Sequence, residues 1–343
     1  MSSVSTATAP SPQSGRPLVS ILVINYNYGR FLRSAVDSAL AQTYPNVEVI
    51  AVDDGSTDAS RDVIESYGSR ISSVFKRNGG HGSALNAGFT ASRGELVIFL
   101  DADDELLPTA AAEVVEAWRP GIAKVQFQLE MVDANKVPLG IRVPKFEVFL
   151  PNGDLRNLIR RCGEYPSASS SGNAFNRAAL ERLMPLDEQD WTAVAEKPLV
   201  TLTPFFGDVV SLRKSLGLYR IHDTNESNLG GRYLDRLHRR LTGTSYLPET
   251  LCKTAKRKGI DLDTRVVGST LRMTKMKISS LRLDPATHPI AADSRFGLLV
   301  KGIRALAREP NLSMRNRLAN AVWLTMMAVG PMAVVRRLTA PER

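Results

Sequence analysis

The sequence predicts an α/β fold built on a mostly parallel sheet, and three observations support this prediction. Apolar runs at 19–24, 47–52 and 96–100 have the length and composition of strands that are buried on both faces. Each run ends abruptly in polar or acidic residues. Segments with helical spacing of apolar residues separate the runs, as expected when right-handed crossover helices connect parallel strands. The ends of the three strands are therefore expected at one edge of the sheet.

The elements between these strands can be predicted in order. The first helix is expected at 31–40, because its apolar residues recur at helical spacing. Gly55 permits a sharp turn after the second strand, and the hydroxyls and carboxylate at 56–58 can cap the next helix. The glycine-rich turn at 77–82 lacks the spacing of the G-x-G-x-x-G fingerprint, which excludes a nicotinamide-binding fold. The remaining elements are a helix through Val63 and Ile64, a short strand at 73–76 and a helix at 83–91.

Length and charge divide the chain into two parts. A chain of 343 residues exceeds what one core usually holds, so a main domain with an appendage is expected. Residues 1–231 carry 22 basic and 27 acidic residues, a net charge of −5, whereas residues 232–343 carry 22 basic and 8 acidic residues, a net charge of +14. The acidic part is compatible with a cation site, and the basic part with an anionic surface.

The termini and the cysteines indicate where the protein works. Cys162 and Cys252 are far apart and lack metal-ligand spacing, so a reducing cytoplasm without a disulfide framework is expected. Residues 1–16 are rich in Ser, Thr, Pro and Ala and lack the pattern of a secretion signal, so they are expected to form a disordered leader. The predicted domains are therefore this leader, an α/β domain at 17–228, and a basic, mainly helical region at 229–343.

Acidic residues follow the central strand. The run at 96–100 leads directly into Asp101, Ala102, Asp103 and Asp104. Because side chains alternate along an extended chain, Asp101 and Asp103 are expected to point to the same side. Two carboxylates at the carboxyl edge of a sheet suit Mg²⁺ or Mn²⁺, which share their remaining positions with substrate phosphates. The alternative is that these acids only begin a solvated loop.

Five different short motifs follow one another between residues 17 and 225. They are Val19 to Asn27, Ser38 to Tyr44, Val52 to Asp58, Asn86-Ala87-Gly88 with Arg93-Gly94-Glu95, and Leu100 to Asp104. In this order and spacing they resemble the family 2 glycosyltransferases with the GT-A fold. The resemblance implies a Rossmann-like mixed, mostly parallel sheet flanked by helices, here with a mainly helical C-terminal extension. It also implies inverting transfer of a sugar from a nucleotide-diphosphate sugar.

The resemblance also assigns roles at the donor site. Tyr26 would stack on the base and Asp54 would accept a hydrogen bond from it, whereas Asp53 would lie near the base or ribose, or else cap the following turn. Asp103 would chiefly ligate Mg²⁺ or Mn²⁺, with Asp101 near the ribose or the metal. His222 would ligate the metal or be structural. The residues assigned to nucleotide binding are Ile24, Tyr26, Asp53, Asp54, Asn86 and Asp101, and those assigned to the metal are Asp101, Asp103 and His222.

An inverting transfer needs a base for the acceptor hydroxyl. In the family, the base is an acid that precedes an apolar helix, and here such a helix is predicted at 199–206, ended by Gly207. This position favours Glu196 over Asp190 as the base. The alternative is that Glu196 is only a surface acid at the start of a helix. Pro198 suits the first turn of that helix. The resemblance also places Arg220, Ser171, Gly172 and Asn173 beside the diphosphate or the acceptor. The alternative for Arg220 is that it braces a loop.

The basic C-terminal region is predicted to be helical at 272–283 and 298–307. Residues 319–335 contain no charge, but the run is marginal for a spanning helix. Arginines flank it on both sides, at positions 315, 317, 336 and 337. Two interpretations stay open: an interfacial helix on the cytoplasmic leaflet of the membrane, or a helix packed against the catalytic domain or the second subunit of a homodimer.

Taken together, the sequence predicts a metal-dependent hexosyltransferase of polysaccharide or glycolipid biosynthesis. Its partners would be a nucleotide-diphosphate sugar and a glycan or lipid-linked acceptor, and it would work in the cytoplasm or at the inner face of the cell membrane. The alternative is a non-catalytic subunit that binds a nucleotide or glycan, which the unusual Glu196-Lys197-Pro198 favours. Nucleic-acid binding is not expected, because aromatic and basic residues are not interleaved.

Overall fold

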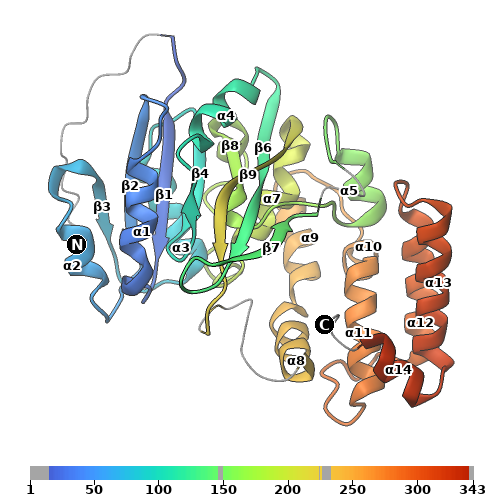
Figure 1. Cartoon of the computed structure of the whole chain (residues 1–343). Helices are drawn as coiled ribbons and strands as arrows, with labels where there is room; N and C mark the ends of the chain where they lie inside the picture. Colours follow the sequence, from blue (N-terminus) through green and yellow to red (C-terminus); the bar gives the residue numbers. More distant parts are fainter. Residues whose placement is uncertain (1–14, 146–149, 224, 226–232, 340–343) are drawn as a thin grey trace. The chain divides into compact units, whose positions relative to one another are not determined.

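The computed structural model of the chain describes residues 15–145, 150–223, 225 and 233–339. Most of the predicted leader at 1–16 therefore lies outside the described residues. The chain forms two compact units, shown in Figure 1. The first unit spans 1–155 and 166–221, and the second spans 156–165 and 222–343. The second unit thus includes residues 156–165, which lie between the two segments of the first unit in the sequence.

One sheet organises the described part of the first unit. Its nine strands are β1 (Val19–Asn25), β2 (Val47–Asp53), β3 (Ser72–Phe75), β4 (Leu96–Asp101), β5 (Glu105–Leu106), β6 (Ile122–Val132), β7 (Pro138–Val143), β8 (Asn173–Asn176) and β9 (Asp208–Arg220). Their order is β3-β2-β1-β4-β8-β6-β9-β5, with β7 paired to β6. The pairs β3-β2, β2-β1 and β1-β4 are parallel, β8 runs antiparallel to both its neighbours, and β9 is parallel to β6. The predicted mixed sheet is confirmed, but it is parallel only from β3 to β4 and between β6 and β9, because β5, β7 and β8 pair with antiparallel neighbours.

Helices cover both faces of this sheet. In α1 (Gly29–Leu40), Leu32 and Val36 belong to the same core cluster as Ile21 and Val23 of β1. In α3 (His81–Ala91), a Cβ at Gly88 would lie 3.3 Å from Leu22 Cδ1, on the other side of β1. Because neighbouring side chains of a strand point to opposite faces, α1 and α3 lie on opposite faces of the sheet. The other helices of this unit are α2 (Ser60–Glu65), α4 (Ala110–Ala117), α6 (Arg177–Glu181) and α7 (Glu196–Leu202).

This arrangement creates a topological switch point between β1 and β4. The chain leaves β1 through α1 to reach β2, and it returns from β3 through α3 to β4, on the other side of β1. In the register of the sheet, Ile24 is paired with Asp101 and Asn25 with Asp53. Open α/β sheets bind ligands at the carboxyl ends of strands at such a point. The predicted acids therefore lie at the edge where a ligand is expected.

The described part of the second unit is helical. Its helices are α5 (Arg156–Cys162), α8 (Tyr233–Thr244), α9 (Leu247–Arg257), α10 (Thr264–Val267), α11 (Leu271–Leu283), α12 (Arg295–Arg308), α13 (Met314–Val329) and α14 (Met332–Thr339). The helices predicted at 272–283 and 298–307 are confirmed as α11 and α12. Ile278, Leu298, Met327 and Val335 form a core that α11 to α14 share.

The uncharged run at 319–335 does not form one helix. It supplies the last part of α13 and the start of α14, which are separated at Gly330 and Pro331. The buried guanidinium of Arg282 donates hydrogen bonds to the carbonyls of Ala328 and Gly330, so it neutralises the carboxyl end of α13. In the described parts of the chain, every helix is too short or too polar to cross a membrane.

Candidate functional site

The carboxylates that follow β4 are crowded together. Asp101 ends the strand and is half-buried, and Asp104 is buried. Burial raises the pKa of Asp101 well above its usual value, and the charges of Asp104, Asp103 and Glu196 raise it further. Burial and the charge of Asp103 raise the pKa of Asp104 in the same way. The ionised forms of Asp101 and Asp104 are therefore unfavourable, and binding of a proton or a cation there would be favourable.

The metal role of Asp101 and Asp103 stays a prediction that rests on the chemistry of their carboxylates. Among the described residues, no group of three or more His, Cys, Asp or Glu side chains lies close enough together to hold a metal ion by itself. Mg²⁺ and Mn²⁺ do not require such a group, because one or two carboxylates, waters and substrate phosphates complete their coordination. His222 belongs to the second unit, where it is buried and its backbone N–H donates to Asn225 Oδ1 at 2.5 Å. Its metal role stays a prediction.

Arg220 braces the acidic loop from the end of β9. Its Nε donates to the carbonyl of Asp103 at 2.9 Å, and its guanidinium forms an ion pair with Glu105. Its backbone N–H donates to Asp104 Oδ1 at 3.1 Å. The guanidinium carbon also lies 5.0 Å from the ring centre of Phe31. Since Arg220 is only 2% exposed, these contacts correspond to the bracing alternative, and contact with phosphate stays a prediction.

A buried polar network supports the other side of the acids. Ser171 Oγ donates to Asp104 Oδ2 at 2.6 Å and accepts the N–H of Asp101 at 3.1 Å. Asn173 Nδ2 donates to the carbonyl of Ser169 at 2.6 Å, and Lys124 Nζ donates to Asn173 Oδ1 at 2.8 Å. Burial lowers the pKa of Lys124 well below its usual value.

The residues of this network are packed too closely to face solvent. Ser171 and Asn173 are fully buried. A Cβ at Gly172 would lie 2.6 Å from Ala168 Cβ, so a side chain has no room there. In the described structure these three residues hold their protein neighbours. Their predicted contact with the diphosphate or the acceptor stays a prediction.

The aspartates that follow β2 are saturated with hydrogen-bond donors. Asp53 accepts hydrogen bonds from Asn25 Nδ2 at 2.8 Å, from Ser56 Oγ at 2.5 Å and from Ser56 N at 3.1 Å. Asp54 is 3% exposed and accepts from Lys76 Nζ at 2.5 Å, from Gly79 N at 3.0 Å and from Gly80 N at 2.9 Å. Asp53 therefore caps its turn, and Asp54 orders the glycine-rich loop. Their predicted roles at the nucleotide stay predictions.

The glycine-rich loop in turn holds the segment that precedes the candidate base. The N–H groups of His81 and Gly82 donate to the carbonyls of Thr192 and Trp191 at 2.8 and 2.9 Å. A Cβ at Gly82 would lie 2.5 Å from the Trp191 carbonyl oxygen, which explains the glycine at this close approach. Asn86 adds a second clamp on this segment, since its side chain exchanges hydrogen bonds of 2.9 and 2.8 Å with the backbone of Leu186. A nucleotide contact of Asn86 stays a prediction.

Glu196 begins α7, and Pro198 lies in the first turn. The helix predicted at 199–206 is found as α7, which starts at 196, followed by a 3₁₀ turn at Thr203–Phe206 and then Gly207. Glu196 Oε2 lies 3.6 Å from His81 Nδ1, and that nitrogen accepts the N–H of Ala195 at 3.3 Å. Because its charge also raises the pKa of Asp101, Glu196 shares one electrostatic environment with the acids of β4.

The remaining candidates differ in exposure. Tyr26, just after β1, is 47% exposed, and this fits an aromatic ring that stacks on a base. Ile24 is buried at the end of the same strand. Asp190 lies in the turn held by Asp187, whose Oδ1 accepts the N–H of Asp190 at 3.2 Å. The structure places His81 beside Glu196, a neighbour that the sequence did not single out; a histidine directly after a glycine run at a helix start was the available signal.

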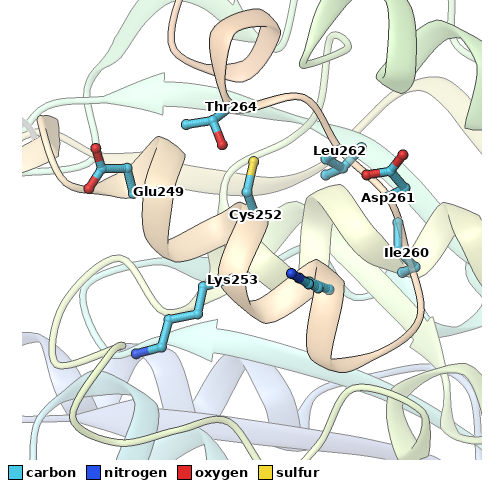
Figure 2. A pocket seen from close by; sticks show the side chains of 8 residues that line it. Glu249, Cys252, Lys253, Ile260, Asp261, Leu262 and Thr264 are labelled. Carbon is cyan, nitrogen blue, oxygen red and sulfur yellow. The ribbon is translucent and has the colours of Figure 1, made fainter.

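The second unit contains a pocket of about 270 Å³, shown in Figure 2. Its lining mixes both charge signs and includes none of the predicted site residues. Cys252 lies at its centre, and burial raises the pKa of the thiol, so this cysteine is a poor nucleophile. The lining residues are Glu249, Cys252, Lys253, Lys256, Ile260, Asp261, Leu262 and Thr264.

Sequence comparisons connect the chain to known proteins. Residues 20–184 match the family model described as glycosyl transferase family 2. An uncharacterized glycosyltransferase of Nostoc sp. is 37% identical over 216 residues, which cover 60% of this chain and 66% of that protein. An uncharacterized glycosyltransferase of Rickettsia prowazekii is 48% identical over 92 residues, or 27% of this chain and 29% of that protein. The chain thus matches less than two thirds of the length of these relatives.

Solved structures share the fold at low sequence identity. TarS 1–349 of S. aureus in complex with UDP is 15% identical, with a TM-score of 0.52 over 94% of this chain and 90% of that chain. The mannosyltransferase PcManGT of Pyrobaculum calidifontis, in complex with GDP-Man and Mn²⁺, is 19% identical, with a TM-score of 0.50 over 96% of this chain and 89% of that chain. The predicted GT-A-like fold with a helical C-terminal region is confirmed.

Proposed function

Because residues 20–184 match the family model of glycosyl transferase family 2 and a glycosyltransferase is 37% identical over 216 residues, we propose that this chain belongs to that family and transfers a sugar, with inversion, from a nucleotide-diphosphate sugar to an acceptor hydroxyl. One observation carries the proposal. Burial raises the pKa of Asp101 at the switch point of the sheet, and the charges of Asp104, Asp103 and Glu196 raise it further, although Glu196 begins a helix 95 residues further along the chain. The acids proposed to bind the donor, Asp101 and Asp103, and the acid proposed to act on the acceptor, Glu196, therefore share one electrostatic environment.

The donor would lie across the ends of β1 and β4. The exposed ring of Tyr26 offers a face to the base, and Asp101 and Asp103 would hold a divalent cation against the diphosphate. When bound, such a cation supplies Lewis-acid stabilisation of the departing diphosphate. Binding of GDP-Man and Mn²⁺ by PcManGT and of UDP by TarS supports this assignment by analogy. Arg220 and Ser171 would keep the acidic loop in place while the donor binds.

The acceptor hydroxyl would lose its proton to Glu196. An inverting displacement needs a base on the side of the sugar opposite the leaving group, and Glu196 comes from an element other than β4. The nearby His81 Nδ1 accepts a hydrogen bond from the Ala195 backbone, so His81 helps to fix the start of α7. Asp190 is the second choice for the base.

The broader role follows from the same reasoning. We propose that the acceptor is a glycan or a lipid-linked sugar and that the product enters a polysaccharide or glycolipid. The reaction would take place in the cytoplasm, at the inner face of the cell membrane. The strongly basic second part of the chain supports a location beside an anionic surface.

Two assays test the proposal. A thermal-shift panel of UDP, GDP, dTDP and CDP, each with and without Mn²⁺, should single out one nucleotide whose stabilisation requires the cation. Hydrolysis of the matching nucleotide sugar should then be lost in Asp103→Asn. Asp62→Asn, an exposed acid on α2, serves as the matched control and should keep full activity.

The base is tested separately. Glu196→Gln should bind the donor normally but fail to transfer, whereas Glu181→Gln, an exposed acid on α6, should transfer normally. If the wild type binds a nucleotide yet is as inert as Asp103→Ala with every donor, the chain is a non-catalytic binding subunit and the proposed activity is wrong.

A further inference from the structure

The helix α13 is apolar on two sides. Its inner side packs into the core of the second unit through Leu324, Met327 and Ala328, which are at most 3% exposed. The other side carries five apolar residues that are exposed to solvent. This outer row consists of Met314 (78% exposed), Leu318 (67%), Val322 (52%), Met326 (37%) and Val329 (71%).

The outer row forms one continuous face. Its members are spaced by four, four, four and three residues, which places them on a single side of an α-helix. At 1.5 Å per residue, the 15 steps from Met314 to Val329 span roughly 22 Å. Thr325 and Arg315 are the polar residues within this sector, and Arg315 lies at its amino-terminal end. A continuous apolar face of this length is uncommon on a soluble protein unless something covers it.

Charge around the row indicates what covers it. Residues 295–339, which form α12 to α14, contain eight basic residues and one acid, Glu309. The basic residues exposed to solvent are Arg295, Lys301, Arg304, Arg315, Arg336 and Arg337. A second copy that docked through the same face would bring two such positive surfaces together, which is unfavourable. An anionic surface would instead be attracted.

We propose that the outer row of α13 docks this protein on the surface of an anionic lipid bilayer. The apolar side chains would enter the boundary between headgroups and acyl chains, and the flanking arginines and lysine would contact the anionic headgroups. The helix would lie in the plane of the surface. This inference depends on the surface of the second unit and goes beyond the proposed transferase activity.

Vesicle co-sedimentation of the full chain tests the docking face. Vesicles of phosphatidylcholine are compared with vesicles in which phosphatidylglycerol replaces part of it. The double variant Leu318→Glu/Val322→Glu places two carboxylates in the outer row without removing a core contact, since both side chains are exposed. We expect the wild type to bind the anionic vesicles in a salt-sensitive manner and the double variant to bind at least tenfold more weakly.

A matched control makes the same change of charge elsewhere. Leu139 and Ile141 are exposed apolar residues of β7 in the first unit, so Leu139→Glu/Ile141→Glu should bind the anionic vesicles like the wild type. Equal binding by the wild type and the α13 variant would overturn the proposal, as would equal binding to neutral vesicles.

Sedimentation velocity separates the competing occupant. If the wild type forms a dimer that Leu318→Glu/Val322→Glu dissociates, and it does not bind vesicles, a second copy covers the row and the lipid proposal is wrong. Because the readouts are partition to vesicles and mass, loss of sugar transfer in another variant does not affect them. A chain that binds vesicles but transfers no sugar would leave the docking proposal standing and contradict only the proposed activity.

Discussion

β2 and β4 lie on either side of β1, and each is followed by a group of aspartates, yet the two groups have opposite surroundings. Asp53 and Asp54, after β2, accept six hydrogen bonds from Asn25, Ser56, Lys76, Gly79 and Gly80. After β4, by contrast, Asp101 is half-buried and Asp104 is buried, and burial together with neighbouring carboxylates raises the pKa of both. The first group uses its charge to hold the fold, and the second keeps charge that a ligand can use.

The largest effect is expected at the second group. Asp103→Asn should lower the rate of sugar transfer by about a thousandfold, because it removes a ligand of the divalent cation that would stabilise the leaving diphosphate. Its free energy of unfolding should change little, or increase, since one of the crowded negative charges is removed. Turnover of the nucleotide sugar and urea unfolding measure the two quantities. A variant that stays fully active would remove the distinction between the two groups.

The first group should respond in the opposite way. Asp54→Asn should lower the free energy of unfolding by about 3 kcal/mol, because the ammonium of Lys76 loses a buried partner at 2.5 Å. Urea unfolding measures the change, with Asp62→Asn as the exposed control. A second substitution, Lys76→Met, should restore part of the lost stability. If Asp54→Asn unfolds like the wild type, Asp54 does not hold the fold and the contrast fails.

A smaller effect is expected from the hydroxyl that joins Asp104 to the sheet. Ser171→Ala removes the 2.6 Å hydrogen bond to Asp104 Oδ2 and should cost about 1 to 2 kcal/mol of stability. The pKa of Asp104 should then rise further, because the Ser171 hydroxyl favours its charged form. Thermal unfolding in the absence of metal checks the stability change. The conservative Ser171→Thr should keep most of the wild-type stability, provided that the added methyl group is accommodated.

The smallest effect is a dependence of metal stabilisation on pH. The folded-state pKa values of Asp101 and Asp104 are raised, so their stabilising contribution is complete below the unfolded value of about 3.9 and is lost as pH rises through the raised values. A divalent cation replaces the displaced protons. The increase in Tm that Mn²⁺ produces should therefore grow as the pH rises from about 4 towards neutrality. An increment that is constant over this range would argue against a cation beside these acids.

The sequence predicted the central strands well, because continuous apolar runs such as 19–24 and 96–100 have few alternatives in a folded chain. It also predicted a helix after Glu196, where Pro198 lies in the first turn and Gly207 ends the 3₁₀ turn that follows α7. The uncharged run at 319–335 was harder, because composition does not show whether Gly330 and Pro331 break a helix or only bend it.

The side-chain partners could not be predicted, because they depend on contacts between distant parts of the chain. Arg220 and Ser171 reach Asp104 across 116 and 67 residues, and Asn86 reaches Leu186 across 100. In the sequence, Asp53 and Asp54 follow an apolar run just as Asp101 and Asp103 do. The donors of Asn25, Ser56, Lys76 and the glycine-rich loop distinguish the aspartates after β2 from the crowded ones after β4.

The most direct test of a donor site at the end of β4 is anomalous X-ray scattering from manganese. Crystals would be soaked with Mn²⁺ and the nucleoside diphosphate that gives the largest thermal shift. We predict an anomalous peak within bonding distance of the Asp103 carboxylate, beside Asp101, with the diphosphate on its other side and the base against Tyr26. A bound nucleotide with its manganese peak away from these carboxylates, or with the peak beside Asp53 and Asp54, would contradict the assignment.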